Sequence, residues 1–245
     1  MNAENKVLGE GVRTLKLRDQ APDCEIYINS QLYELPEICS NKKVLDIGCG
    51  YGWNKPIVEK VGGEWIGVEP FEGGANTVIG TAEDLPFEDN SFDVVIMDAV
   101  LEHVEDVDAS FLEISRVLKP EGVFIGYSAF MECFHEISYS HLSFKGIEYY
   151  AQKYEMNLES INGGRAFGID YHLRNLFYPI PFGLARKAIA IGIRGLIRFK
   201  SFLGYLGLRI ARKYTHEEAK NQSLLYYKIN CLGQSNGFDF IIRKK

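Results

Sequence analysis

Two short segments carry residue types that bind a flat or extended ligand. The run Val44–Gly52, VLDIGCGYG, passes from an apolar strand into three glycines, Gly48, Gly50 and Gly52. A second apolar run, Trp65–Val68, ends on Glu69. Glycine lets the backbone take positive φ and lets a ligand lie against main chain where a Cβ would collide. The pairing therefore predicts a ligand on the loop with an acid beside it.

The spacing of this loop distinguishes between two ligand classes. Dinucleotides and other adenosine cofactors both use a strand, a glycine turn and an acid about twenty residues later that binds ribose hydroxyls. A dinucleotide fingerprint, G-x-G-x-x-G, aims a helix N-terminus at pyrophosphate, whereas here Trp53 stands in place of the last glycine. Asp46 adds a carboxylate that repels phosphate and suits a cationic amino acid moiety. S-adenosylmethionine, which carries an ammonium, a sulfonium and a ribose, fits this pattern.

Four blocks of the chain, at about residues 43–126, follow the order of one known family. They read VLDIGCGYG, WIGVEP, GTAEDLPFEDNSFDVVIMDAVLEHV and LKPEGVFIG. In these blocks the sequence resembles the class I S-adenosylmethionine-dependent methyltransferases, in particular the group of quinone-biosynthesis and small-molecule enzymes. The resemblance implies an enzyme that uses S-adenosylmethionine and releases S-adenosylhomocysteine.

The resemblance also implies which residues surround the cofactor. Glu69 stands in the place of the ribose-binding acid, residues 81–83 flank the adenine, and Asp98 lies near the methionine part. Family members often carry an acid where this chain has Thr81, so the adenine amino group is expected to meet Glu83 or main chain. Cys49 lies in the loop as a packed thiol, because no basic neighbour is apparent. The expected cofactor set is Asp46, Gly48, Cys49, Gly50, Gly52, Glu69, Thr81, Ala82, Glu83 and Asp98.

Three histidines are candidates for a general base. His103 follows the fourth strand at the carboxyl edge where ligands of open α/β sheets bind, although it can equally orient the start of a helix. His135 and His141 lie in the loop after the fifth strand, on the other rim of the same crevice. With Glu136 they suggest a metal, but no fourth ligand joins them, so no metal site is expected.

Methyl transfer to oxygen on a small metabolite, or on a glycan- or lipid-linked intermediate, is the function that these residues favour. The family's amino-group enzymes for nucleic acids or glutamine often have Asn or Asp followed by two prolines and an aromatic residue. Here residues 98–101 read DAVL, which disfavours that class. A non-catalytic cofactor-binding or membrane-docking scaffold is the alternative, and an oxidoreductase is disfavoured by Asp46 and Trp53.

Alternating strand and helix signals predict a doubly wound, mostly parallel, seven-stranded sheet of the Rossmann-like methyltransferase type. Residues 1–170 and 233–245 would form this core, with a helical insertion, 171–232, before the last strand. A first helix is expected over Tyr27–Ile38, and a loop in place of a helix after Glu69. The first twenty residues have no apolar h-region and the five cysteines show no C-x-x-C, so a cytoplasmic location is expected.

The insertion is basic although the chain has a net charge of −6. Residues 171–220 hold ten Lys and Arg against Glu217 and Glu218, while the rest of the chain holds 17 basic and 31 acidic residues. It is either a cap whose apolar side packs on the sheet and walls the pocket, or an interfacial helix over residues 184–214 on an anionic membrane, with Phe199, Phe202 and Leu203 inward. The second reading places the protein at the inner membrane face. Nucleic-acid binding is disfavoured, because the overall basic footprint is missing.

Overall fold

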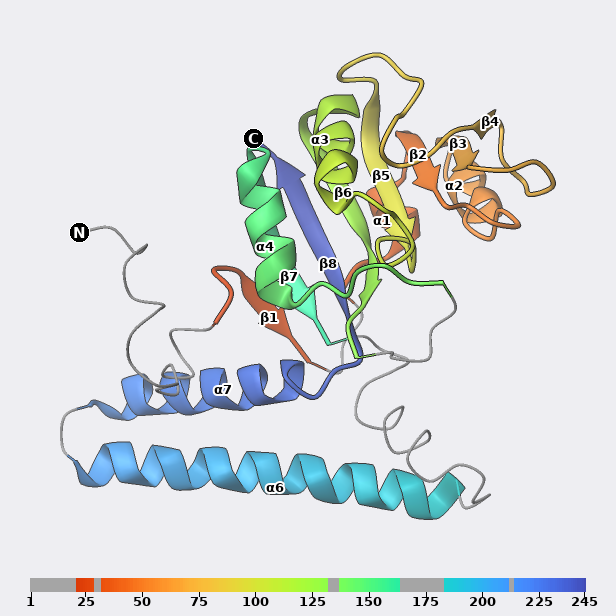
Figure 1. The fold of residues 1–245 in the computed structure, drawn as a ribbon. Helices are drawn as coiled ribbons and strands as arrows, with labels where there is room; N and C mark the ends of the chain where they lie inside the picture. Colours follow the sequence, from red (N-terminus) through yellow and green to blue (C-terminus); the bar gives the residue numbers. More distant parts are fainter. Residues whose placement is uncertain (1–20, 29–31, 132–136, 164–182, 212–213) are drawn as a thin grey trace, which may run out of the picture.

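One mixed sheet forms the centre of the molecule (Figure 1). The computed structural model describes residues 21–28, 32–131, 137–163, 183–211 and 214–245. The strand order is β1-β7-β8-β6-β5-β2-β3-β4. The strands are β1 (Glu25–Tyr27), β2 (Lys43–Ile47), β3 (Glu64–Glu69), β4 (Val78–Ile79), β5 (Phe92–Asp98), β6 (Leu118–Ala129), β7 (Met156–Asn162) and β8 (Gly237–Lys244).

The described residues form α1 (Leu35–Ile38), α2 (Lys55–Lys60), α3 (Val107–Val117), α4 (Phe144–Lys153), α6 (Gly183–Ile210) and α7 (His216–Leu232). The first four of these helices cover the two faces of the sheet. On one face, Cys39 after α1 and Val58 of α2 pack with Trp65. On the other face, the core includes Phe111 of α3 and Ile147 of α4. Both layers are needed because the strands of a parallel sheet are apolar on both faces.

The predicted fold class is confirmed, with one additional strand. β8 runs antiparallel to both β6 and β7, and every other pairing is parallel. The expectation of seven strands was wrong, because β1 adds an eighth strand by pairing in parallel with β7, Glu25 opposite Ser160. Of the helix expected over Tyr27–Ile38, the described residues form only α1, with Tyr27 in β1, and residues 29–31 lie outside the described ranges. Pro36 lies in the first turn of α1, where a missing N–H costs nothing, and a proline cannot lie in a helix interior.

The segment between β3 and β4 has no helix, as expected from its length. Its backbone is instead tied to neighbouring elements. The N–H of Ala75 donates to the carbonyl of Gly50 at 2.9 Å, and the N–H of Thr77 donates to that of Gly67 at 3.0 Å. This short connection therefore closes over the glycine loop and completes one side of it.

The predicted insertion before the last strand contains the antiparallel pair α6 and α7, below the sheet in Figure 1. Thr215 and Glu218 form a reciprocal capping box that starts α7. Ile229 and Leu232 of α7 belong to the main core, so this helix attaches the pair to the sheet. None of the helices in the described ranges is both long and apolar enough to cross a bilayer.

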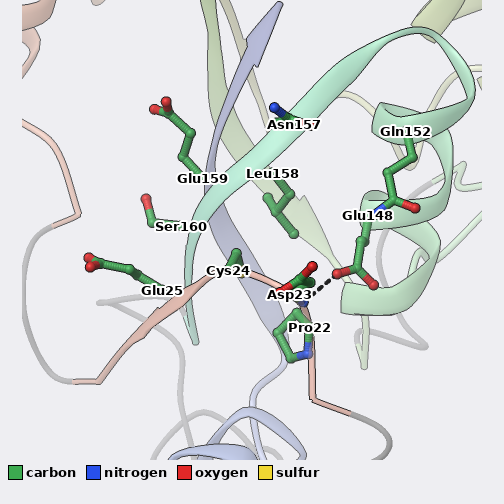
Figure 2. Close-up of a pocket in the computed structure, with 10 residues that line it drawn as sticks. All are labelled: Pro22, Asp23, Cys24, Glu25, Glu148, Gln152, Asn157, Leu158, Glu159 and Ser160. Atoms are coloured by element: carbon green, nitrogen blue, oxygen red, sulfur yellow. Dashed lines mark hydrogen bonds between the residues drawn. The ribbon is translucent and has the colours of Figure 1, made fainter. Parts of the chain in front are cut away.

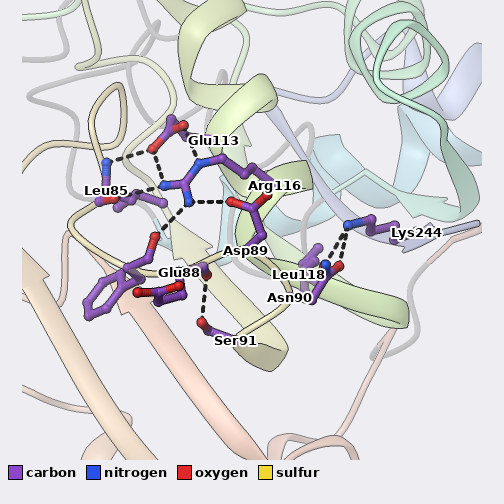
Figure 3. A network of polar contacts seen from close by, with 10 residues as sticks. Leu85, Glu88, Asp89, Asn90, Ser91, Glu113, Arg116, Leu118 and Lys244 are labelled. Carbon is purple, nitrogen blue, oxygen red and sulfur yellow. Dashed lines mark hydrogen bonds and ion pairs between the residues drawn. The ribbon is translucent and has the colours of Figure 1, made fainter.

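A guanidinium holds the loop between β4 and β5 against α3 (Figure 3). Arg116 donates to the backbone carbonyls of Leu85 at 2.9 Å and Phe87 at 2.6 Å. Its fork also pairs with Glu113, at 2.7 and 2.8 Å, and Glu113 accepts the N–H of Leu85 at 2.8 Å. These bonds raise the pKa of Arg116 and lower that of Glu113. This loop begins with the predicted adenine-flanking residues, 81–83. Arg116 therefore fixes the backbone that directly follows them.

Arg116→Met is expected to lower the free energy of unfolding by about 1–3 kcal/mol, because two loop carbonyls and Glu113 lose a charged partner. Urea unfolding measures this change. Arg116→Lys keeps the charge but loses the fork, so it should recover only part of the stability. Wild-type stability in both variants would contradict this account.

Candidate functional site

Three glycines after β2 have positive φ, and each has a different surrounding. A Cβ on Gly48 would lie 2.3 Å from Val100 Cγ2, and one on Gly52 would lie 2.7 Å from Ala75 Cβ. Gly50, with φ +51°, has no atom within 4 Å of its Cβ position. Packing therefore requires the outer two glycines, while the middle one leaves open space above the main chain. This space is the surface on which a ligand can lie.

Glu69 lies directly beside this surface. It ends β3, its side chain is buried, and its carboxylate accepts the backbone N–H of Gly50. The parallel register, Ile47 opposite Val68, produces this meeting because it places the ends of β2 and β3 side by side. A carboxylate at this point can accept the two hydroxyls of a ribose. The two sequence segments that predicted a ligand are thus brought together.

Asp46, on β2 just before the glycine loop, binds residues on β3 and just before α2. It is 2% exposed, and it accepts the indole N–H of Trp65 at 3.0 Å and the amide N–H of Asn54 at 3.3 Å. Burial raises the pKa of Asp46 to about 6, against the opposing effect of these hydrogen bonds. Its oxygens face β3 and the residue before α2. The structure therefore gives Asp46 a positioning contact, and its expected role toward the amino acid moiety stays a prediction.

The loop thiol is packed rather than activated. Cys49 is buried, and a Cβ on Gly67 would lie 2.7 Å from its Sγ. Burial, followed by the charges of Asp46 and Glu69, raises the pKa of Cys49 to about 11. The side chain is thus a neutral thiol at physiological pH. This agrees with the expectation that it is not a nucleophile.

The predicted adenine-flanking residues lie next to Glu69. The N–H of Gly80 donates to the carbonyl of Glu69 at 2.9 Å, which brings the following turn alongside β3. Thr81 is exposed and Ala82 is buried. The carboxylate of Glu83 accepts the N–H of Glu105 at 3.0 Å and so joins this turn to the loop after β5. The identity of the group that meets the adenine amino group stays a prediction.

The rim opposite Glu69 contains Asp98 and a tyrosine that the sequence reasoning did not select. Asp98 ends β5 and is exposed by its surface area. Desolvation of its carboxylate by the neighbouring chain nevertheless raises the pKa of Asp98. Tyr33 comes from the segment before α1. Its pKa is raised mainly by burial and then by the charges of Asp98 and Asp239. The helical pattern gave no signal for Tyr33, because its position depends on packing against residues far along the chain, such as Val58 and Trp65.

The histidines differ in what their ring nitrogens bind. His103 Nδ1 lies 2.6 Å from the carbonyl of Ile137, which accepts the proton of this nitrogen. His141 engages both nitrogens, with the carbonyl of Phe130 at 3.0 Å and the hydroxyl of Ser138 at 3.1 Å. His135 lies outside the described residues. The two bonds of His141 are those of a loop tether, and the role of His103 as a base stays a prediction.

A pocket at the far edge of the sheet is a different feature (Figure 2). It lies between β1, β7 and α4, and its polar lining includes Asp23, Glu25, Glu148 and Glu159. Lys145 pairs with Glu148 there. Four strands of the sheet separate β7 from β3, so this pocket is not part of the glycine-loop site.

The sequence also matches known proteins in the region of the glycine loop. Residues 45–126 match the methyltransferase domain family. Residues 45–126 form a class I S-adenosylmethionine-dependent methyltransferase domain. Their glycine loop, the carboxylate of Glu69 beside it and the strand order agree with this assignment. S-adenosylmethionine is the cofactor of this class of domain.

Two curated relatives align with part of the methyltransferase domain. The human protein named arginine-hydroxylase NDUFAF5, mitochondrial, is 33% identical over 110 residues, which cover 40% of this chain and 31% of the relative. A ubiquinone biosynthesis O-methyltransferase of Azorhizobium caulinodans is 32% identical over 99 residues, which cover 34% of this chain and 38% of the relative. The chain thus spans about a third of the length of these relatives.

A solved structure shares the fold over most of the chain. It is a provisionally named sarcosine dimethylglycine methyltransferase from Galdieria sulphuraria. The TM-score is 0.53 at 18% identity, over 86% of this chain and 82% of the other. At this identity the likeness supports the fold of the methyltransferase domain and not its substrate.

Asp46→Asn tests the buried carboxylate through the pH dependence of stability. A pKa of about 6 in the folded protein lies above the value near 4 expected in the unfolded chain, so the folded state binds the proton first as the pH falls. Between pH 7 and pH 4 this site should therefore add about 2 kcal/mol to the free energy of unfolding of the wild type, and nothing to that of the variant.

Urea unfolding at several pH values measures the difference in free energy of unfolding between the wild type and Asp46→Asn. The other titrating groups contribute equally to both proteins, so their effects cancel in this difference. A difference that stays constant with pH would show that Asp46 titrates normally in the folded protein.

Proposed function

We propose that the protein transfers the methyl group of S-adenosylmethionine to an oxygen of a small metabolite or of a glycan- or lipid-linked intermediate. The observation that carries the proposal is the meeting of Glu69 with the open backbone at Gly50, at the carboxyl ends of β2 and β3. This arrangement offers a ribose acceptor beside a main-chain surface without side chains. An adenosine cofactor is the ligand that suits both parts.

The bound cofactor supplies an activated methyl group on a sulfonium, so the protein has little covalent work to do. Its residues hold the donor and the acceptor in line and exclude water. Gly50 admits the cofactor against the main chain, and Glu69 holds the ribose hydroxyls. Asp98, at the end of β5, adds negative charge on the side expected for the methionine part. Arg116 and Asp46 keep the surrounding loops in place.

An oxygen acceptor loses a proton on methylation, and His103, which follows β5 at the carboxyl edge of the sheet, is the base that we propose. Its Nδ1–H donates to the carbonyl of Ile137, which orients the ring. Such general-base assistance commonly contributes about 10²- to 10⁴-fold to a rate. His135 and His141 stay secondary candidates from the sequence.

The acceptor and the location belong to the same proposal. The relative from Azorhizobium is named for ubiquinone biosynthesis and for O-methylation, which supports an oxygen on a lipid-soluble ring compound. A cytoplasmic protein that binds peripherally at the inner membrane face would reach such acceptors. The human relative is named as a hydroxylase, so a different reaction, or cofactor binding without turnover, is the alternative that an activity assay must exclude.

Calorimetric titration with S-adenosylhomocysteine tests the cofactor site. Glu69→Gln should weaken binding about 10- to 100-fold, because the ribose hydroxyls lose a charged acceptor. Glu64→Gln is the matched control, since Glu64 begins the same strand, is exposed and lies far from the loop. Gly50→Val should abolish binding, because its side chain enters the open space. No binding by the wild type would reject the proposal.

Transfer of a labelled methyl group tests the reaction itself. The protein is incubated with methyl-labelled S-adenosylmethionine and with either a water-soluble or a lipid extract as the source of acceptors. His103→Asn should lower the labelling rate about 10²- to 10⁴-fold while S-adenosylhomocysteine binding is unchanged. An unchanged rate would remove His103 as the base, and the absence of labelling in both extracts would favour the non-catalytic alternative.

A further inference from the structure

The longest helix of the molecule, α6, contacts the rest of the protein along one narrow stripe. Its least exposed residues recur every three or four positions and face α7: Ile193, Ile197, Ser201, Tyr205 and Leu208. Ser223 of α7 donates to the carbonyl of Ser201 at 2.7 Å, and Tyr205 bonds His216 at 2.9 Å. α7 in turn packs on the core. Figure 1 shows α6 on the outer side of α7, away from the sheet.

The side of α6 opposite this stripe is apolar and exposed. Leu196 is 68% exposed, Phe199 58% and Leu203 50%, and Phe202, Leu206 and Ile210 share this side of the helix. Positions three and four apart lie on one helical face, and this face carries no charged residue. A contiguous apolar surface of this length marks an interaction site. The cap interpretation needed this side to pack on the sheet, and the structure turns it outward.

The charges of α6 flank the apolar face. The helix holds six Lys and Arg residues and no Asp or Glu. Arg198 lies 6.0 Å from the ring centroid of Tyr227 on α7, so it lies on the flank of the helix rather than on its outer face. Arg209 falls on the same flank by helical periodicity and Lys200 falls on the other, while Lys187 and Arg194 lie at the border of the stripe that faces α7. A cationic flank on each side of an apolar face is the pattern of a helix that lies in the membrane interface.

We propose that the outer face of α6 docks on an anionic lipid surface, with the apolar side chains inserted and the flanking cations at the headgroups. The helix is about 42 Å long and would lie in the membrane plane. A second copy of the chain is the competing occupant. Pairing two such faces would bring two cationic helices together without any acidic partner on either, which electrostatics disfavours. An anionic bilayer supplies the missing negative charge.

The docking face lies at the edge of the sheet that carries the site. α7 leads into β8, whose first residue, Gly237, pairs with Ala129 at the carboxyl end of β6. The carboxyl ends of β2 and β3, with Gly50 and Glu69, lie at this same edge. A docked bilayer would therefore lie near the proposed methyl-transfer site, so the methyl acceptors should be lipid-soluble compounds. That last step rests on the proposed function, whereas the docking itself does not.

Flotation of the full chain with vesicles tests the docking. The vesicles contain phosphatidylcholine alone or mixed with phosphatidylglycerol, and no cofactor is present, so failure of the proposed methyl transfer does not affect the result. We expect flotation only with the anionic vesicles, weakened by salt. Leu196→Glu with Leu203→Glu should weaken partitioning by about tenfold or more for each leucine lost.

Two controls keep the outcome clear. Leu112→Glu alters a half-exposed leucine of α3 and should not change flotation. Lys187→Gln with Lys200→Gln should weaken binding to anionic vesicles while the urea unfolding midpoint is unchanged. Equal flotation with neutral vesicles, or none with either kind, would overturn the proposal. So would a dimer in solution that dissociates in the Leu196→Glu, Leu203→Glu variant while vesicle binding is absent.

Discussion

The parallel pairing of β2 with β3 is the constraint on which the site depends. With Ile47 opposite Val68, both strands end at one edge, and the chain after β2 must turn there beside Glu69. Positive φ at Gly48, Gly50 and Gly52 makes that turn possible, and close packing leaves no room for a side chain on the outer two. The open backbone at Gly50 is a consequence of this geometry rather than a separate feature.

Buried polar contacts hold the parts of the site in register. Asp46 joins β2 to Trp65 and Asn54, and its burial there raises its pKa. Arg116 binds the carbonyls of the loop that follows the adenine-flanking turn. Each contact fixes a loop through a side chain that is itself held by a strand or a helix. A rigid frame of this kind suits a reaction that depends on alignment more than on covalent chemistry.

The helical pair α6 and α7 adds an exposed apolar surface to this frame. α7 is part of the core, whereas α6 contacts the protein by one stripe and turns its apolar face outward. This face lies at the edge where β2, β3 and β6 end, so the glycine loop with Glu69 and the apolar face of α6 share one side of the molecule. The chain thus combines an acidic body with a basic outer helix.

The sequence alone determined the sheet class, the glycine loop with Glu69, and the helical insertion, because each depends on local order: strand, turn, acid, and helical spacing. Tertiary structure decided what local order leaves open. It made Glu25–Tyr27 an edge strand, placed Tyr33 near Asp98, turned Asp46 toward Trp65, and separated His103 from His141 by their partners. It also turned α6 outward. These outcomes depend on contacts between residues far apart in the chain, which spacing along the sequence does not encode.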